Sequence, residues 1–380
     1  MSKAAELAAL IANVNKGSSL ANKNLIINGG MTVAQRSSSA VAVSDGSNEN
    51  YQTLDRFRFL FANSAGGACN ISQDTDVPSG YGFTNSYKVD VTTADTSISA
   101  THMISIAHRV EAQNIANCGW VHNSSSSYMT LSFWAKSVKA GTYCVSIDAS
   151  DSSSTRKFVK EYTLVANTWK KVEITFAGES GVTVNNDTGI GLDIRWTLQV
   201  GADRDNATDN TWNSSDTSIG TSNQVNFFDD GANNFFLTGV MLEVGEKASP
   251  QFEHEPFETT LAKCQRYFCK SYDYEDAVGT ATQVAGIYQR QPASSVEGAV
   301  SNRAVQIRYP VELRGEPTAT VYSLNGTSGA VSDCGTGYSH GSDDSGCFFN
   351  GTDGTSGLSK ITGTSGDSMI GFHFTADAEL

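Results

Sequence analysis

Hydrophobic and polar residues alternate along most of the chain after about residue 24. The clearest alternating runs span residues 56–61, 129–136, 142–147, 172–176 and 192–200, and a last one covers 236–244. A period of two predicts strands with one buried face and one solvated face. Many short strands, joined by loops rich in Ser, Asn, Gly and Asp, predict a mainly β fold, an antiparallel jelly-roll β-sandwich.

Residues 1–16 depart from this pattern and predict a short helix. Leu7, Leu10, Ile11 and Val14 fall at helical spacing, and the Gly and Ser residues that follow end the helix. A helix of this length is marginal by itself, so it needs a partner to be stable. We interpret it as an anchor, with a frayed terminus as the alternative.

A second β-block is predicted after residue 257. The segment 250–257 contains two prolines and is interpreted as a linker, and residues 258–272 begin as a helical turn and end as a strand. Alternation returns at 305–313 and 370–374, on either side of a Gly- and Ser-rich stretch, 324–368. The chain thus divides into an N-terminal helix and linker (1–22), a jelly-roll domain (23–257) and a C-terminal β-sandwich-like domain (258–380). The last is assigned to trimerisation or a distal receptor contact.

Charge and cysteine content narrow the function. The chain has 40 Asp and Glu against 26 Lys and Arg, a formal net charge of -14. Such a surface repels phosphate backbones, so no nucleic-acid partner is expected. No run of about 18 apolar residues is present, so no membrane insertion is expected. Seven scattered cysteines, an odd number, favour reduced thiols over a disulfide framework.

Motifs for catalysis or metal binding are missing from the sequence. It contains no G-x-S-x-G, H-E-x-x-H, P-loop or Rossmann glycine pattern, so we expect neither an enzyme nor a cofactor. Asp203, Asp205 and Asp209 alternate as calcium ligands do, but their loop lacks the glycine and terminal glutamate of an EF-hand. Solvated loop charge is the simpler interpretation. Glu111 and Asp193 are interpreted as solvated strand residues rather than as a glycosidase pair.

Tryptophans in polar loops are the candidates for a ligand site. The apolar face of a sugar ring stacks on an aromatic ring, while Asn and Asp side chains bind its hydroxyls. The best candidate is Trp212, flanked by Asn210 and Asn213, and the second is Trp120, near Asn123. A place in the core or at an interface is the alternative for each of the two rings.

Three other tryptophans belong to predicted strands. Trp134 falls on the polar face of its strand, which predicts exposure or a subunit contact. Trp196 falls on an apolar face and is expected in the core, and Trp169 begins a strand and is expected to pack.

Five motifs, in order along the chain, resemble fibre-like virion proteins of bacteriophages. They are NLIINGGMTVAQR at 24–36, YQTLDRF at 51–57, LSFWAK at 131–136, FLTGVMLEVG at 236–245 and CQRYF at 264–268. The resemblance covers about residues 24–268. It implies a virion surface protein, a tail fibre or head fibre, assembled in the cytoplasm of the bacterial host.

The same resemblance implies how such a protein is built and used. It implies a jelly roll like a carbohydrate-binding module, a homotrimer, and attachment of the N-terminal helix to other virion proteins of the tail or capsid. Host-surface glycans are the implied receptor. Two alternatives stay open: a capsid or head decoration protein with a mainly structural role, and a polysaccharide-degrading enzyme.

Overall fold

The computed structural model describes Lys3 and residues 23–44, 51–62, 66–291, 300–334, 342–362 and 368–380. The helical positions Leu7, Leu10, Ile11 and Val14 lie outside the described residues. Within the described part, no helix is long and apolar enough to span a membrane.

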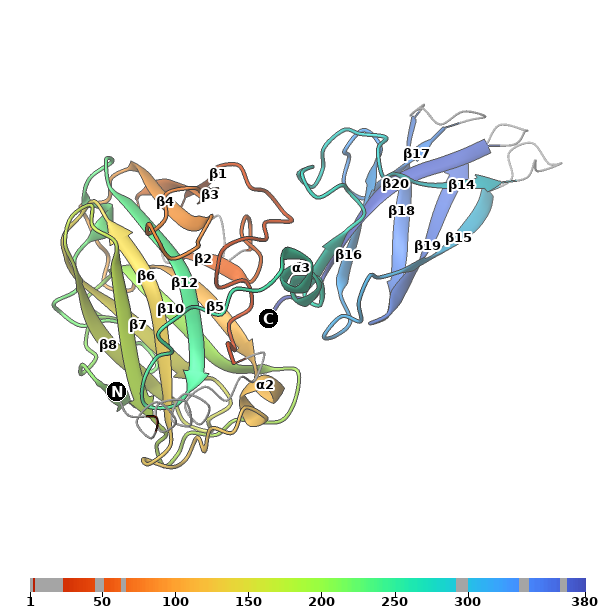
Figure 1. Cartoon of the computed structure of the whole chain (residues 1–380). Helices are drawn as coiled ribbons and strands as arrows, with labels where there is room; N and C mark the ends of the chain where they lie inside the picture. Colours follow the sequence, from red (N-terminus) through yellow and green to blue (C-terminus); the bar gives the residue numbers. More distant parts are fainter. Residues whose placement is uncertain are drawn as a thin grey trace.

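Two six-stranded antiparallel sheets form a sandwich (Figure 1). The first sheet runs in the order β1 (Val41–Ser44), β3 (Ala68–Asp74), β4 (Ser86–Thr93), β12 (Asn234–Val244), β6 (Tyr128–Ser137) and β9 (Lys170–Ala177). The second runs in the order β11 (Thr211–Asn213), β8 (Lys157–Leu164), β7 (Gly141–Ala149), β10 (Ile190–Val200), β5 (Met103–Glu111) and β2 (Phe57–Ala62). The predicted mainly β sandwich is confirmed, and the alternating runs correspond to β2, β6, β7, β9, β10 and β12.

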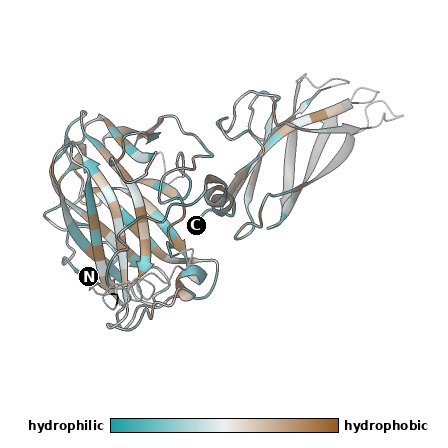
Figure 2. Ribbon diagram, in the orientation of Figure 1, coloured by the Kyte–Doolittle hydropathy of each residue, from teal (hydrophilic) through white to brown (hydrophobic). Residues whose placement is uncertain are grey.

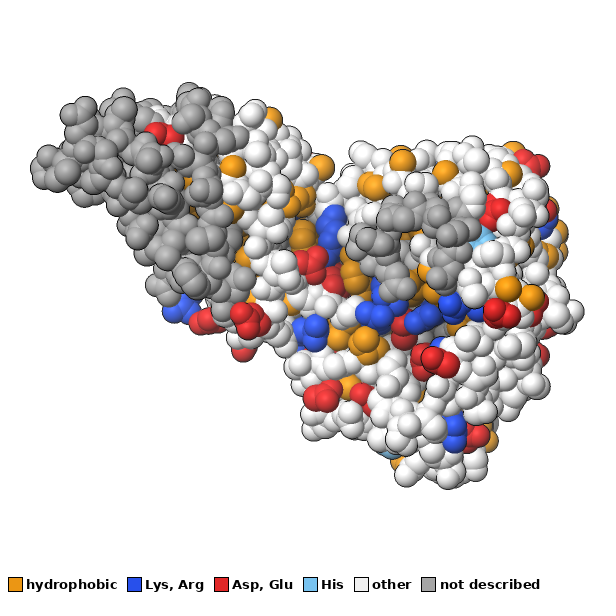
Figure 3. All heavy atoms as spheres, turned by 180° about the vertical axis from the view of Figure 1, so that it is seen from behind, with side chains coloured by type: hydrophobic (Ala, Val, Ile, Leu, Met, Phe, Trp, Pro, Cys, Tyr) orange, Lys and Arg blue, Asp and Glu red, His pale blue; other side chains and the backbone are white. Residues whose placement is uncertain are grey.

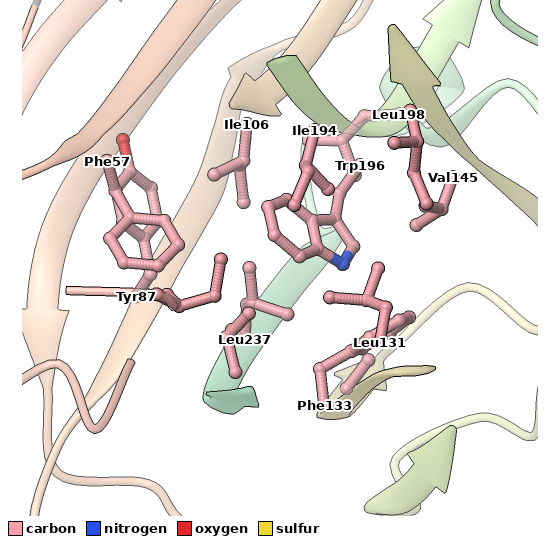
Figure 4. Close-up of a cluster of buried hydrophobic side chains, with 14 of the residues drawn as sticks. Phe57, Tyr87, Ile106, Leu131, Phe133, Val145, Ile194, Trp196, Leu198 and Leu237 are labelled. Atoms are coloured by element: carbon pink, nitrogen blue, oxygen red, sulfur yellow. The ribbon is translucent and has the colours of Figure 1, made fainter. Parts of the chain in front are cut away.

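The core lies between these two sheets, where the hydrophobic half of each alternating strand points inward. Figure 2 shows hydrophobic and hydrophilic residues alternating along the sandwich strands, and Figure 4 shows the large side chains that meet in the middle. Trp196 is fully buried, with its ring 5.7 Å from Phe133 and 6.2 Å from Phe57 between centroids. Burying each such side chain stabilises the fold by about 1.5–3 kcal/mol. The core position expected for Trp196 is confirmed.

Two short helices and a 3-10 turn interrupt the strands of the described chain. The strand β5 continues up to Glu111 and is followed directly by the short helix α2 (Ala112–Ala116). Residues 258–272 form α3 (Phe257–Gln265) followed by β13 (Phe268–Lys270), as their sequence predicts. A 3-10 turn, η1 (Phe227–Asp229), precedes β12.

The strands after α3 build a third sheet, called the C-terminal lobe below (Figure 1). Its order is β13, β20 (Ser368–Asp377), β17 (Ala330–Asp333), β18 (Ser342–Asn350), β19 (Gly354–Thr362) and β15 (Val300–Arg308). β14 (Ile287–Gln291) and β16 (Thr318–Ser323) also pair with β20. The strand pattern at 305–313 ends early, at Arg308, because Pro310 cannot donate to a ladder. The Gly- and Ser-rich stretch contains three of these strands.

The motif at 24–36 closes over a bulge in β12. The Asn24 amide donates to Val240 O at 3.1 Å, and the Asn28 amide donates to Val33 O and Asp55 O. A Cβ on Gly29 would lie 2.0 Å from Val240 O, so only glycine fits there. The Asn and Gly residues of this motif are therefore framework residues.

The end of the chain is buried among arginines where the C-terminal lobe meets the sandwich. Glu379, 5% exposed, pairs with Arg56 and, at 3.4 Å, with Arg36. Arg36 also reaches Asp377 at 2.9 Å, and the Arg109 guanidinium donates to Leu380 O. Figure 3 shows basic and acidic side chains gathered where the two lobes meet.

The loop before β13 completes this junction from the other side. Glu111, expected to be solvated, is 1% exposed and accepts hydrogen bonds from Arg266 at 2.8 Å and from the Tyr267 hydroxyl at 2.7 Å. The Arg56 guanidinium lies 3.5 Å from the Tyr267 ring centroid, and that of Arg36 lies 3.8 Å from the Phe268 ring centroid. Stacked arginines that are also ion-paired hold both lobes in one arrangement.

Removing the buried carboxylate should loosen the junction. In Glu379→Gln the Arg56 guanidinium, 1% exposed, loses its anion, and breaking such a pair costs roughly 3 kcal/mol. We expect a lower melting temperature and faster hydrogen exchange at residues 264–270. The exposed Glu316→Gln is the control. Unchanged exchange in Glu379→Gln would contradict this role for the carboxylate.

Asp55 at the same junction should make stability depend on pH. Burial raises its pKa to about 6, although Arg36 and Gln35 act in the opposite direction. The folded state therefore holds this proton more tightly than the unfolded chain, and stability from this group rises as the pH falls. Between about pH 7 and pH 5 the free energy of unfolding should gain about 1 kcal/mol from this group. In Asp55→Asn this gain in the free energy of unfolding, measured with urea, should be absent. An equal pH dependence of that free energy in the native chain and in the variant would contradict the prediction.

Candidate functional site

The tryptophans predicted to stack on sugars are part of the hydrophobic core. Trp120 is 4% exposed, its indole N–H donates to Ser127 O at 3.2 Å, and its ring packs edge-on against Phe176. This burial supports the core alternative for Trp120 over a place in a glycan site.

Trp212 is half-buried at the open edge of the same cluster. Its indole N–H donates to Ala177 O at 2.9 Å, and its ring packs against Phe158 and Phe176. Trp212 lies on the short edge strand β11, directly opposite Phe158 on β8, and its ring packs against the core. The glycan-stacking role of this half-buried ring stays a prediction.

The asparagines of the predicted site are mainly turn residues. Asn213 accepts from Thr208 N at 2.8 Å and donates to the carbonyls of Thr208 and Thr211. Asn210 is exposed with a φ of 60°, a conformation that Asn tolerates in turns. Asn123 is exposed on a separate loop. Asn213 thus stabilises its own turn, and a glycan contact of these three side chains stays a prediction.

The three alternating aspartates do not form a cation site. Asp209 accepts from Lys160 Nζ at 2.8 Å and from Glu161 N at 2.7 Å, so its charge is already balanced. In the described ranges, no group of three His, Cys, Asp or Glu side chains is placed to hold a metal ion. Asp203 and Asp205 are loop residues without such a grouping.

Asp193, expected on a solvated face, is buried on the second sheet. Its Oδ2 pairs with Arg58 at 3.2 Å, Arg109 at 3.5 Å and Arg195 at 2.9 Å. Burial raises the pKa of this carboxyl, but the three arginines outweigh it and hold the pKa below its ordinary value. Asp193 and Glu111 are thus both buried and ion-paired with arginines, and the solvated positions expected for them are wrong.

A group of aromatic rings, of which Tyr81 is the exposed member, lies instead on the outer face of the first sheet. Tyr81, in the loop before β4, is 53% exposed, and its ring centroid is 4.4 Å from that of Trp134 on β6. Buried Phe236 on β12 and half-buried Trp169 before β9 form a second pair on the same sheet, with their centroids 6.1 Å apart. We call these four residues the aromatic platform. Trp134 is half-buried on the polar side of its strand, as its sequence position predicts.

A glycine in β12 makes room for this platform. Gly239 has a φ of 61° at the bulge between Thr238 and Met241. A Cβ there would lie 2.6 Å from the Phe83 ring and 2.9 Å from Trp134 Cδ1. Any side chain at this position would displace the rings of Phe83 and Trp134. The glycine of the motif at 236–245 is therefore explained by ring packing.

Phe83 and two residues after β12 hold the loop that presents Tyr81. Phe83 packs against Phe252 at 5.1 Å and His254 at 5.2 Å between centroids. The His254 Nε2 lies 2.9 Å from Tyr81 O. A hollow of about 50 Å³ opens beside Phe83, Phe252 and His254 at this end of the platform. The loop is thus fixed before any ligand arrives.

Charged side chains frame the other end of the platform. Asp76 accepts from the Trp169 indole N–H at 3.0 Å and from Lys136, whose Nζ lies 4.5 Å from the Phe236 ring centroid and 5.5 Å from the Trp169 ring centroid. Partial burial raises the pKa of Asp76, but the hydrogen bonds from Lys136 and Trp169 outweigh it. They hold the pKa below the ordinary value, so this carboxylate is ionised and oriented at neutral pH.

The sequence offered a partial signal for this site. The period-two pattern placed Trp134 outward, and that position was the clue to a surface ring. Tyr81 gave no such signal, because it lies between two glycines in a loop with no repeating pattern. Its proximity to Trp134 depends on how that loop folds across the sheet.

Comparison with known proteins gives fold likeness at low similarity. No protein-family model and no curated protein matches the chain. A putative sugar binding protein from Bacteroides thetaiotaomicron shares 13% identity over 58% of this chain and all of its own, at a TM-score of 0.33. A domain of tailspike protein 4 from bacteriophage CBA120 shares 12% over 59% of this chain and 22% of its own, at 0.30.

A structure described as CBM4 is similar at the same level. It shares 13% identity over 58% of this chain and 99% of its own, at a TM-score of 0.29. Scores this low do not transfer a ligand or an activity to this chain.

Proposed function

We propose that this protein binds glycans on the surface of a bacteriophage virion, without catalysing their cleavage. The observation that carries the binding function is the exposed Tyr81 ring packed, at a tilt, against Trp134 on a strand, with carboxylates at the same surface. An aromatic ring of this kind covers the C–H face of a sugar, and carboxylates accept hydrogen bonds from its hydroxyls.

The rings of the aromatic platform are held in place before a glycan binds, which favours binding. Trp134 and Phe236 are strand residues, and the Tyr81 loop is packed by Phe83 and His254, so little side-chain freedom is lost on binding. The platform is open and shallow, which predicts weak binding at a single site. A homotrimer displaying three such sites raises the effective concentration and gives useful avidity.

The virion part of the proposal rests on the motif resemblance. In that proposal residues 1–16 attach the protein to other virion proteins of the tail or capsid, and the sandwich faces host-surface glycans. The buried junction favours a second candidate, a decoration protein with a mainly structural role, because Arg36, Arg56 and Arg266 of the resembling motifs are used there for framework contacts.

Replacing the exposed ring tests glycan binding. Tyr81→Ala should weaken adsorption to host cells by about five- to twenty-fold, the worth of one stacked ring. Folding should be unchanged because the side chain is half-exposed. Tyr81→Trp should retain binding, and Val165→Ala, an exposed site elsewhere, is the control. Normal adsorption by Tyr81→Ala, measured as a rate or by glycan pull-down, would remove the platform from consideration.

Deleting residues 1–16 tests attachment. The truncated protein should be absent from purified particles while it still binds host cells in solution. Immunoblots of particles, with the full chain as control, measure its occupancy. Truncated protein present at full occupancy would disprove the anchoring role.

A further inference from the structure

Ion pairs on the outer face of the first sheet share one orientation. In the pair Lys136–Asp76 the side chains are 14% and 42% exposed, and in Lys171–Glu173 they are 28% and 49% exposed. Lys88 lies 3.6 Å from Asp74 and 3.9 Å from Asp90, and both carboxylates are more exposed than the ammonium. In each of these pairs the acidic side chain is more exposed than the lysine side chain, by the smallest margin for Lys88 and Asp74.

These pairs surround the aromatic platform. Lys88 and Lys136 are directly opposite Phe236 on the neighbouring strands β4 and β6. Lys171 is directly opposite Trp134 on β9. A ligand that lands on the rings therefore meets four carboxylates, while the three ammonium groups already have anionic partners.

We infer that the platform takes neutral, hydroxyl-rich glycans and rejects polysaccharides that carry carboxylate or sulfate groups; this rests on the proposed glycan-binding function. Ionised carboxylates accept hydrogen bonds from sugar hydroxyls and make them stronger than neutral acceptors do. The same carboxylates repel an anionic chain within a Debye length of the surface. The net charge of -14 adds to this repulsion at longer range.

The first experiment compares polymers with and without charge on the full chain. The probes are laminarin, mannan and dextran as neutral polymers, and alginate and dextran sulfate as anionic ones. We expect binding of at least one neutral polymer that changes little between about 0.05 M and 0.5 M salt. Binding of the anionic polymers should be about ten-fold weaker or more.

The possible results distinguish failure of this inference from failure of the proposed glycan binding. Stronger binding of alginate or dextran sulfate, lost at high salt, would overturn this inference while leaving glycan binding intact. No binding of any polymer, even by the assembled particle, would instead overturn the proposed function.

The second experiment reverses the selectivity with a double substitution, Asp90→Asn with Glu173→Gln. Lys88 and Lys171 each lose an anionic partner, so dextran sulfate should bind roughly ten-fold more tightly in low salt. Neutral polymer should bind about two- to five-fold more weakly, because two charged acceptors are lost.

A matched variant separates local from global charge. Glu312→Gln with Glu316→Gln changes the net charge by the same amount at exposed positions of the C-terminal lobe. Both affinities should stay as in the native chain. An equal gain for dextran sulfate in both double variants would show that net charge, and not the platform, sets the selectivity.

Discussion

The arrangement of this molecule depends on the buried ion cluster around Glu379. A charge removed from water costs several kcal/mol unless a partner lies against it. Arg36 and Arg56 therefore hold the end of the chain to the sandwich, and Glu111 holds Arg266 in the loop before β13. Segments that are far apart in the sequence thereby fix one another, and two β lobes behave as one frame.

Charged side chains play a different part on the outer face of the first sheet. Ion pairs near solvent contribute about 0–1 kcal/mol, so their arrangement is little constrained by stability. Lys136 and Asp76 can therefore be arranged around Trp169 with little effect on the stability of the fold. Buried ion pairs thus build the frame, and exposed ones set the chemistry that a ligand meets beside Tyr81.

Prediction from sequence succeeded where the signal was local. The alternation around Trp134 and Trp196 placed one ring outward and one inward, and both positions are confirmed. It did not decide between a ligand site and core packing for Trp120 and Trp212, because a polar sequence around a ring does not reveal whether that segment packs onto a sheet. It failed at Asp193, where burial depends on arginines from three strands. The candidate site was found only in part, through Trp134.

The sequence by itself determined the mainly β class, the core-facing positions of the alternating strands and the net negative charge, because these follow from neighbouring residues and from composition. Only the tertiary structure decided which carboxylates are buried and which rings form a platform. Gly239 leaves space that Phe83 fills from a distant loop, and Glu379 finds its arginines near the other end of the chain. Such pairings are set by long-range packing, since the free energy of a buried charge or ring depends on partners that no local pattern records.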